Sequence, residues 1–132
     1  MQFELSTQRR EQFVDITEQV AKAVAESRVR DGAVLIYCPH TTAGITINEN
    51  ADPDVVRDLL DGLERLAPRD AGWRHVEGNS DGHLKASLVG SSVTVPLEQG
   101  RLVLGTWQGV YFAEFDGPRH RRVIVMTLSA VG

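Results

Sequence analysis

The segment from His75 to Lys85 gathers most of the groups in this chain that can do chemistry. It holds two of the four histidines, two acids, an amide and a lysine, separated by two glycines. Imidazoles and carboxylates supply metal binding and proton transfer, and glycines let the backbone approach a ligand closely. We interpret the segment as a site, and the remaining chain as the frame that brings a third histidine, His40, to it.

His40, His75 and His83 are the candidate metal ligands. Zinc and related ions bind neutral imidazole, and a catalytic zinc site keeps three protein ligands and one open position. His40 follows an apolar run, His75 lies beside a glycine-containing loop, and His83 falls in the first turn of a predicted helix, where the dipole disfavours the imidazolium. The spacing matches no known zinc motif. On spacing alone, three unrelated histidines with local hydrogen bonds are the preferred interpretation.

Glu114 and Glu49 are the candidate catalytic acids. Glu114 lies in an alternating, aromatic-rich strand, where a carboxylate is not expected in the core without a partner. An outward-facing Glu114 is an equally good interpretation. Glu49 and Glu77 lie nearer the histidines in sequence. They are candidates for metal ligands, for hydrogen-bond partners of those ligands or for a general base. Asp52 is more typical of a helix cap.

Hydroxyls, backbone N–H groups and one ammonium form a third group of candidates, for contacts with a phosphate. Neither a P-loop nor a G-x-G-x-x-G motif is present. Each of these residues alone is more typical of a turn or a strand edge. The group consists of Thr41, Thr42, Lys85, Ser91, Ser92 and the loop from Gly105 to Gly109.

Hydrophobic periodicity and capping signals predict the elements that position these residues. Strands are expected at 2–6, 12–16, 33–38, 45–47, 92–95, 101–104, 110–115 and 123–128, and helices at 18–27, from Pro53 to the stop at Pro68, and at 81–89. The first two strands are expected to pair as a hairpin, and strand 33–38 to be covered on both faces. Leu84 and Leu88 are expected to face the core. About eight strands with two or three helices predict an α+β fold with a mixed or antiparallel sheet or sandwich.

Length and composition limit the classes of function. The 132 residues fit one domain, 1–132, and the net charge of −4 gives no basic surface for nucleic acid. The basic cluster Arg119 to Arg122 is more typical of a solvated turn. The single cysteine, Cys38, is interpreted as a small buried hydrophobe in a reducing compartment. Without a signal peptide or a membrane-spanning segment, we expect a cytoplasmic protein with no membrane partner.

Three motifs together resemble the YjbQ-like family, also called the secondary thiamine-phosphate synthase family. The first runs from His40 to Pro53 and includes His-Thr-Thr-Ala-Gly-Ile-Thr-Ile-Asn-Glu-Asn. The second comprises 75–78, His83-Leu84-Lys85-Ala86-Ser87 and Gly90-Ser91-Ser92, and the third comprises Gly100, Gly105-Thr106-Trp107-Gln108-Gly109 and Glu114. The resemblance covers nearly the whole chain, in the family's order.

The resemblance implies a small α+β fold that assembles as a homotrimer, with His40, His75 and His83 on a divalent metal such as zinc. It implies a weak thiamine-phosphate synthase activity that joins hydroxymethylpyrimidine diphosphate to a thiazole phosphate. Asn48, Ser87, Trp107 and Gln108 lie within the motifs and join the substrate-binding candidates. Two alternatives stay open: a metal-dependent phosphohydrolase, and a trimeric small-ligand-binding protein without turnover. Outward faces carrying Val110 and Phe112, or Ile124 and Met126, are candidates for covering by a neighbouring subunit.

Overall fold

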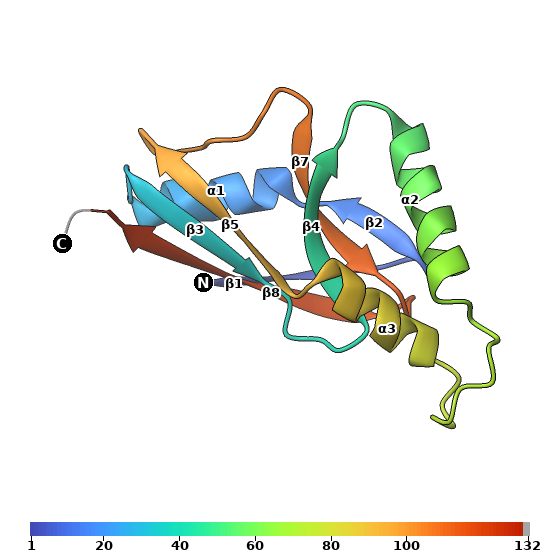
Figure 1. The fold of residues 1–132 in the computed structure, drawn as a ribbon. Helices are drawn as coiled ribbons and strands as arrows, with labels where there is room; N and C mark the ends of the chain where they lie inside the picture. Colours follow the sequence, from blue (N-terminus) through green and yellow to red (C-terminus); the bar gives the residue numbers. More distant parts are fainter. Residues whose placement is uncertain (131–132) are drawn as a thin grey trace.

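Two antiparallel sheets and three helices make up residues 1–130, the part of the chain that the computed structural model describes (Figure 1). The strands are β1 (Gln2–Ser6), β2 (Gln12–Asp15), β3 (Gly32–Tyr37), β4 (Ala43–Glu49), β5 (Ser92–Glu98), β6 (Arg101–Leu102), β7 (Gln108–Glu114) and β8 (His120–Ser129). The helices are α1 (Thr17–Ser27), α2 (Pro53–Leu66) and α3 (Ser80–Val89). One sheet has the order β1-β8-β3-β5-β6 and the other the order β2-β7-β4. The α+β prediction is therefore confirmed.

The two N-terminal strands lie in different sheets. β1 pairs with β8, with Gln2 opposite Ile124, and β2 pairs with β7, with Gln12 opposite Glu114. The predicted hairpin between the two runs is therefore wrong. Alternation shows that a segment is a half-buried strand, but it carries no information about which strand lies beside it.

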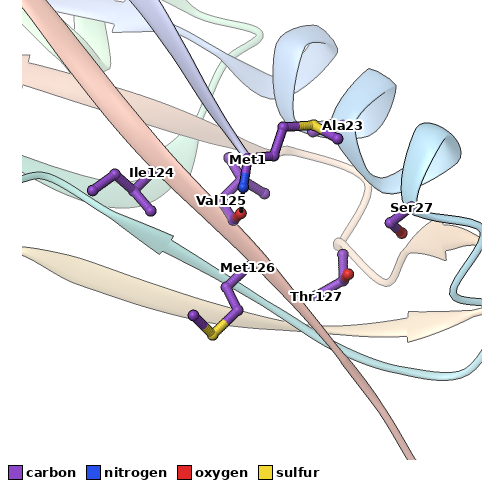
Figure 2. Close-up of a pocket in the computed structure, with 7 residues that line it drawn as sticks. All are labelled: Met1, Ala23, Ser27, Ile124, Val125, Met126 and Thr127. Atoms are coloured by element: carbon purple, nitrogen blue, oxygen red, sulfur yellow. Dashed lines mark hydrogen bonds between the residues drawn. The ribbon is translucent and has the colours of Figure 1, made fainter.

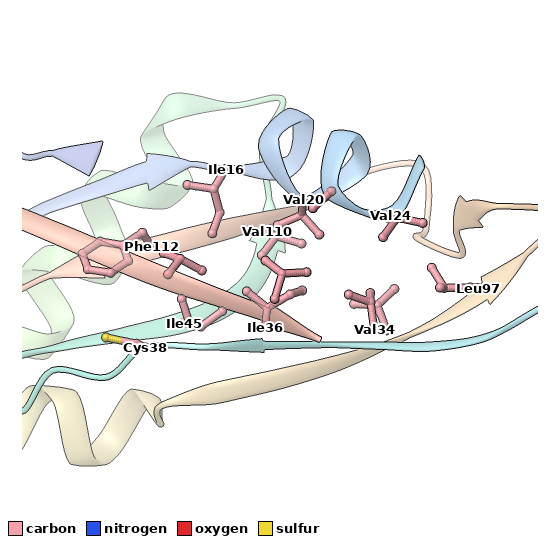
Figure 3. Packing of buried hydrophobic residues seen from close by; sticks show 14 of the residues in the cluster. Ile16, Val20, Val24, Val34, Ile36, Cys38, Ile45, Leu97, Val110 and Phe112 are labelled. Carbon is pink, nitrogen blue, oxygen red and sulfur yellow. The ribbon is translucent and has the colours of Figure 1, made fainter. Parts of the chain in front are cut away.

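The hydrophobic core lies between the two sheets and is closed by α1 (Figure 3). Val20 and Val24, four residues apart on α1, are buried in this core. Val110 and Phe112 of β7 are also fully buried in this core. The expectation that this pair needs a neighbouring subunit is therefore wrong, because the opposite sheet and α1 already cover it.

One face of the five-stranded sheet carries an apolar row that this chain leaves partly exposed. We call it the outer face; its members are Leu35, Tyr37, Ile124, Met126 and Leu128. Register places Leu35 opposite Met126 and Tyr37 opposite Ile124. Met126 is 52% exposed and Leu128 49%. Only the other face of β3 is buried, so the prediction that both faces are covered is wrong.

Helix α2 forms where the local signals predict it. Asp52 caps it by accepting a hydrogen bond from the backbone nitrogen of Asp54 at 2.9 Å, and Pro53 occupies the first turn, where its missing N–H costs nothing.

No helix within residues 1–130 is long and apolar enough to cross a membrane.

Helix α3 also forms where predicted, but with a different face inward. Leu84 is 37% exposed and Leu88 54%, so the prediction that they face the core is wrong. The buried residues of this helix are Asp81, Gly82, Lys85 and Ala86. Gly82 allows α3 to pack closely against the backbone of Phe115, because a Cβ at this position would lie 2.9 Å from the Phe115 carbonyl oxygen.

Candidate functional site

A depression of about 480 Å³ lies where three distant parts of the chain meet. The connection after β3, the loop that leads into α3, and the β7–β8 turn with the start of β8 form its walls. Its lining residues are Pro39, His40, Thr41, Thr42, His75, Glu77, Asn79, His83, Asp116, Arg119 and Arg121. The three predicted metal ligands and two of the predicted anion contacts, Thr41 and Thr42, therefore line one surface.

His40 is half-buried and held by the backbone of β8. Its Nε2 atom accepts a hydrogen bond from the backbone nitrogen of Arg122 at 3.0 Å, and its ring meets that of Phe112 edge-on at 6.5 Å between centroids. Burial, together with the nearby charge of Arg121, lowers the pKa of His40 below its ordinary value. The neutral imidazole, which is the form that binds metals, is therefore favoured.

His75 and His83 form a pair on the other wall. Their rings meet edge-on, with centroids 5.4 Å apart. The Nε2 atom of His75 lies 3.7 Å from a carboxylate oxygen of Glu77. A carboxylate beside an imidazole can orient the ring toward a bound metal.

The three histidines share the depression without closing around a point. Within residues 1–130, the one group of three or more acidic, histidine or cysteine ligand atoms that all lie within 4.8 Å of one another is Glu11, Glu64 and Asp81. That group is already occupied by the side chain of Lys85.

Lys85 is fully buried and donates to three carboxylates. Its Nζ atom lies 2.7 Å from Glu11, 2.6 Å from Glu64 and 2.9 Å from Asp81. Burial alone lowers the pKa of Lys85, but these hydrogen bonds outweigh it and raise the pKa. Three acceptors use all three N–H groups of the ammonium, so Lys85 has none left for the predicted substrate contact.

Asp81 completes this network from inside α3. Two hydrogen bonds from Arg10, at 3.0 and 2.9 Å, join the one from Lys85. Burial raises the pKa of Asp81, but the bonds from Arg10 and Lys85 prevail and bring it down to about 2. The role of Lys85 and Asp81 is thus to anchor α3, which carries His83.

Glu114 is buried and paired, as its aromatic surroundings required. It accepts hydrogen bonds from Thr7 Oγ1 at 2.8 Å, from the backbone nitrogen of Asp116 at 3.0 Å, and from two nitrogens of Arg121. A carboxylate with four donors is poorly placed to take a proton from a substrate. The structure gives the predicted catalytic acid a position behind Arg121 instead of one on the depression.

The other predicted catalytic acid, Glu49, lies at the opposite end of the three-stranded sheet. Register places Glu49 opposite Gln108 and Ala43 opposite Glu114. β4 has seven residues, which separates its two ends by about 20 Å at about 3.3 Å per residue. The predicted residues at this far end are Asn48, Glu49, Trp107 and Gln108. One chain therefore does not bring them to the histidines.

Ser87 and Ser91 line a smaller depression of about 340 Å³ that shares His40 with the first. The remaining residues of this depression are Ala43, Ala86 and Gly90. Ser92 follows on β5, where it pairs with Tyr37 and is exposed. The predicted hydroxyl contacts thus lie on both sides of His40.

Another depression lies beside the N-terminus and holds none of the predicted catalytic, metal-binding or substrate-binding residues (Figure 2). It measures about 320 Å³ and is lined by Met1, Ala23, Ser27 and 124–127. Figure 2 shows the side chain of Met1 directed toward α1, while Ile124 and Met126 point away from that helix.

Sequence reasoning missed five residues of the main depression as lining residues, which are Pro39, Asn79, Asp116, Arg119 and Arg121. Arg119 donates to the backbone oxygen of Asp116 at 2.8 Å and to its carboxylate at 3.0 Å. A signal for Arg121 was present. It lies two residues before Val123 and four before Val125, both buried, so alternation along β8 places it on the inner face.

The comparisons with known proteins agree with this fold. The YjbQ family model, described as UPF0047 protein YjbQ-like, matches residues 1–130. UPF0047 protein MJ1081 of Methanocaldococcus jannaschii is 54% identical over 123 residues, which cover 93% of this chain and 89% of the relative. UPF0047 protein YugU of Bacillus subtilis is 54% identical over 119 residues, or 89% of this chain and 90% of the relative. The chain belongs to the YjbQ/UPF0047 family.

Solved structures support the same assignment. An uncharacterised protein of the YjbQ/UPF0047 family from Clostridium acetobutylicum superposes with a TM-score of 0.95 at 57% identity, covering 97% of this chain and 99% of that one. A YbjQ-like protein of unknown function from Sulfolobus solfataricus gives a TM-score of 0.94 at 34% identity, covering 98% of this chain and 95% of that one. The family and the fold follow from these matches, while their names assign no reaction.

Proposed function

We propose that this protein is a metal-dependent enzyme that acts on phosphorylated small molecules in the depression lined by the three histidines. One observation carries the proposal. His40 from the β3–β4 connection and the contacting pair His75 and His83 from the opposite wall line a single depression together with Arg119 and Arg121. Imidazoles suit a divalent ion, and guanidinium groups suit phosphate oxygens.

The donor set fits zinc in its chemistry. Zinc–nitrogen bonds are about 2.0–2.1 Å long, so a bound ion holds its ligand nitrogens closer together than these three histidines lie. The Nε2 lone pair of His40 is directed at the backbone N–H of Arg122, which leaves the proton of the neutral ring on Nδ1. Metal binding in this depression therefore requires the His40 ring to give up its bond to Arg122 and the three imidazoles to come closer together.

Among the possible reactions we favour the thiamine-phosphate synthase reaction that the family resemblance implies. The bond between the pyrimidine methylene carbon and pyrophosphate breaks, and the thiazole nitrogen bonds to that carbon. This nitrogen carries no proton, so the step requires no general base. A reaction without a general base suits this depression, because Glu114 is engaged by four donors and Glu49 is remote.

The residues of the depression have separate tasks in this reaction. When bound, a divalent ion supplies Lewis-acid stabilisation of the departing pyrophosphate. Arg119 and Arg121 offer charge-assisted hydrogen bonds to its oxygens. Thr41 is exposed on the rim, where its hydroxyl can contact the substrate.

Glu77 favours a second candidate function, a phosphohydrolase. Its carboxylate lies on the rim beside His75 at 3.7 Å and can take a proton from an attacking water. A binding protein without turnover is the third outcome.

An activity assay with and without a chelator separates these three functions. Thiamine phosphate formed from both phosphorylated precursors supports the synthase, whereas inorganic phosphate released from one ester supports the phosphohydrolase. His75→Ala should lose the activity and His120→Ala should keep it. His120 is the matched control because it lies outside the depression, with its Nδ1 3.0 Å from the hydroxyl oxygen of Ser6. Tight binding of both precursors with no product would leave only the binding protein.

We also propose that the protein acts as a homotrimer in the cytoplasm. The trimer rests on the family resemblance and on the outer face, whose half-exposed Tyr37, Met126 and Leu128 form an apolar surface on a sheet. A second copy of the same chain is the occupant that the resemblance implies. The buried thiol of Cys38, whose pKa burial raises to about 11, suits a reducing compartment.

A further inference from the structure

Arg121 is a buried cation at the wall of the candidate site. Its side chain is 3% exposed, and it projects from the inner face of β8 into the depression lined by the histidines. Buried guanidinium groups need partners for most of their five N–H donors. Those partners determine which part of Arg121 faces the depression.

Three of the five donors are used by the protein. Nε donates to Glu114 at 2.9 Å, and Nη2 donates both to the other oxygen of Glu114 and to the hydroxyl of Thr42, the latter at 2.9 Å. This is a two-point contact between a planar fork and a carboxylate, so it fixes the guanidinium plane. No acceptor within residues 1–130 takes the two N–H groups of Nη1.

Glu114 is itself held in place from behind. The hydroxyl of Thr7 and the backbone nitrogen of Asp116 donate to it at 2.8 and 3.0 Å. Every lone-pair direction of the carboxylate is thus engaged, and Glu114 has no contact with the depression of its own. Glu114 therefore holds the guanidinium group of Arg121 in a fixed orientation.

A buried acceptor without a partner lies in the same depression. Asn79 donates through Nδ2 to Asp116 at 2.8 Å, which fixes the orientation of the amide, because the flipped form would set two acceptors against each other. The opposite atom, Oδ1, is buried and has no partner within residues 1–130. An unpartnered buried acceptor in the same depression as unpartnered guanidinium donors calls for a ligand that both accepts and donates hydrogen bonds.

We propose that Arg121 binds a phosphate or pyrophosphate oxygen of the substrate through Nη1, and that Glu114 is the positioning residue that aims it. A singly protonated phosphate meets both requirements, since its oxygens accept from Nη1 and its O–H donates to Asn79 Oδ1. The inference rests on the proposed function for the identity of the substrate, but the anion contact itself requires no metal.

Titration calorimetry with pyrophosphate, on protein treated with a chelator, tests the contact directly. Arg121→Gln should weaken pyrophosphate binding tenfold to a hundredfold, in line with the loss of a charge-assisted pair. Arg121→Lys should weaken it comparably, because one ammonium cannot both pair with Glu114 and reach the anion. Arg122→Gln is the matched control, since its side chain is exposed and directed at Gln2, and its affinity should stay within twofold of the unmodified protein. Unchanged affinity in Arg121→Gln would overturn the proposal.

Arg121→Gln leaves Glu114 buried without its cation, so a second measurement avoids any substitution at Arg121. Side-chain ¹⁵N resonances of Arg121 in the unmodified protein should shift when pyrophosphate is added. Shifts confined to other arginines would contradict the contact.

Glu114→Gln separates positioning from proton transfer. A positioning role predicts a raised KM for the phosphorylated substrate, a kcat within a few-fold of normal and an unchanged pH profile. A lost acidic limb with a collapsed kcat would make Glu114 a general base and overturn its assigned role. If pyrophosphate binding depends on Arg121 but the protein has no metal-dependent activity, the proposed function is wrong and this inference stands. If the metal-loaded protein is active but substitution of Arg121 leaves its affinity for pyrophosphate unchanged, this inference is wrong and the proposed function stands.

Discussion

The backbone nitrogen of Arg122 lies 3.0 Å from Nε2 of His40 and donates a hydrogen bond to it. This bond joins the middle of the β3–β4 connection to the strand that carries Arg121, and it requires an unprotonated Nε2. It therefore selects the neutral Nδ1–H tautomer of His40.

The first prediction concerns the protonation of His40. Burial and the charge of Arg121 lower its pKa, so an NMR titration of the histidine ring protons should give His40 a value below 6.5. Because the unfolded chain then binds a proton more tightly than the folded one, His40 makes the free energy of unfolding fall as pH drops through about 6.5. A His40 pKa above 6.5 would contradict the geometry.

The second prediction concerns the anchor of α3. Lys85→Met leaves Glu11, Glu64 and the fully buried Asp81 without their shared cation, so it should lower the free energy of unfolding by about 3–5 kcal/mol in urea denaturation. Lys22→Met is the control, because Lys22 is exposed on α1 and should change stability by about 0.5 kcal/mol or less. Equal losses for the two variants would mean that the network does not hold α3.

The third prediction compares two helical glycines. Gly62→Ala should raise the free energy of unfolding by about 0.5–1 kcal/mol, since nothing lies within 4 Å of its added Cβ and alanine favours helix. Gly82→Ala should lower it, since its Cβ would lie 2.9 Å from the Phe115 carbonyl oxygen. Stabilisation by both substitutions, measured in the same urea series, would show that α3 does not pack this closely.

The fourth prediction concerns assembly. Light scattering should give the mass of three chains for the unmodified protein and of one chain for Met126→Lys combined with Leu128→Lys, because two charges on the outer face oppose its burial. Leu88→Lys is the control, since Leu88 is 54% exposed on α3 and lies off this face. A monomeric unmodified protein would rule out the trimer.

What the sequence could predict depended on whether a signal is local. α2 was predictable because Asp52, Pro53 and the apolar stripe all act within one helix. The buried face of α3 was predicted wrongly, because Leu84 and Leu88 have the spacing of a core stripe. The face that is buried carries Lys85 and Asp81, whose partners lie far away in the sequence. Pairing of β1 and β2 likewise depended on distant strands.

The candidate site was predictable in part for the same reason. The three histidines and Thr41 and Thr42 do line one depression, which the family motifs implied, although spacing alone favoured three unrelated histidines. Glu49 and Trp107 belong to the same motifs, yet they lie at the far end of β4 and β7, and a linear motif does not reveal this separation. Arg121 was visible only through the alternation of β8, because its buried partner Glu114 lies on another strand.

Zinc content of the purified protein tests the central claim most directly. Elemental analysis should find about one zinc per chain in the unmodified protein and in His120→Ala, and little in His40→Ala, His75→Ala or His83→Ala, each of which removes an imidazole from the depression. Equal metal content in all five proteins, or none in the unmodified one after growth with added zinc, would contradict it.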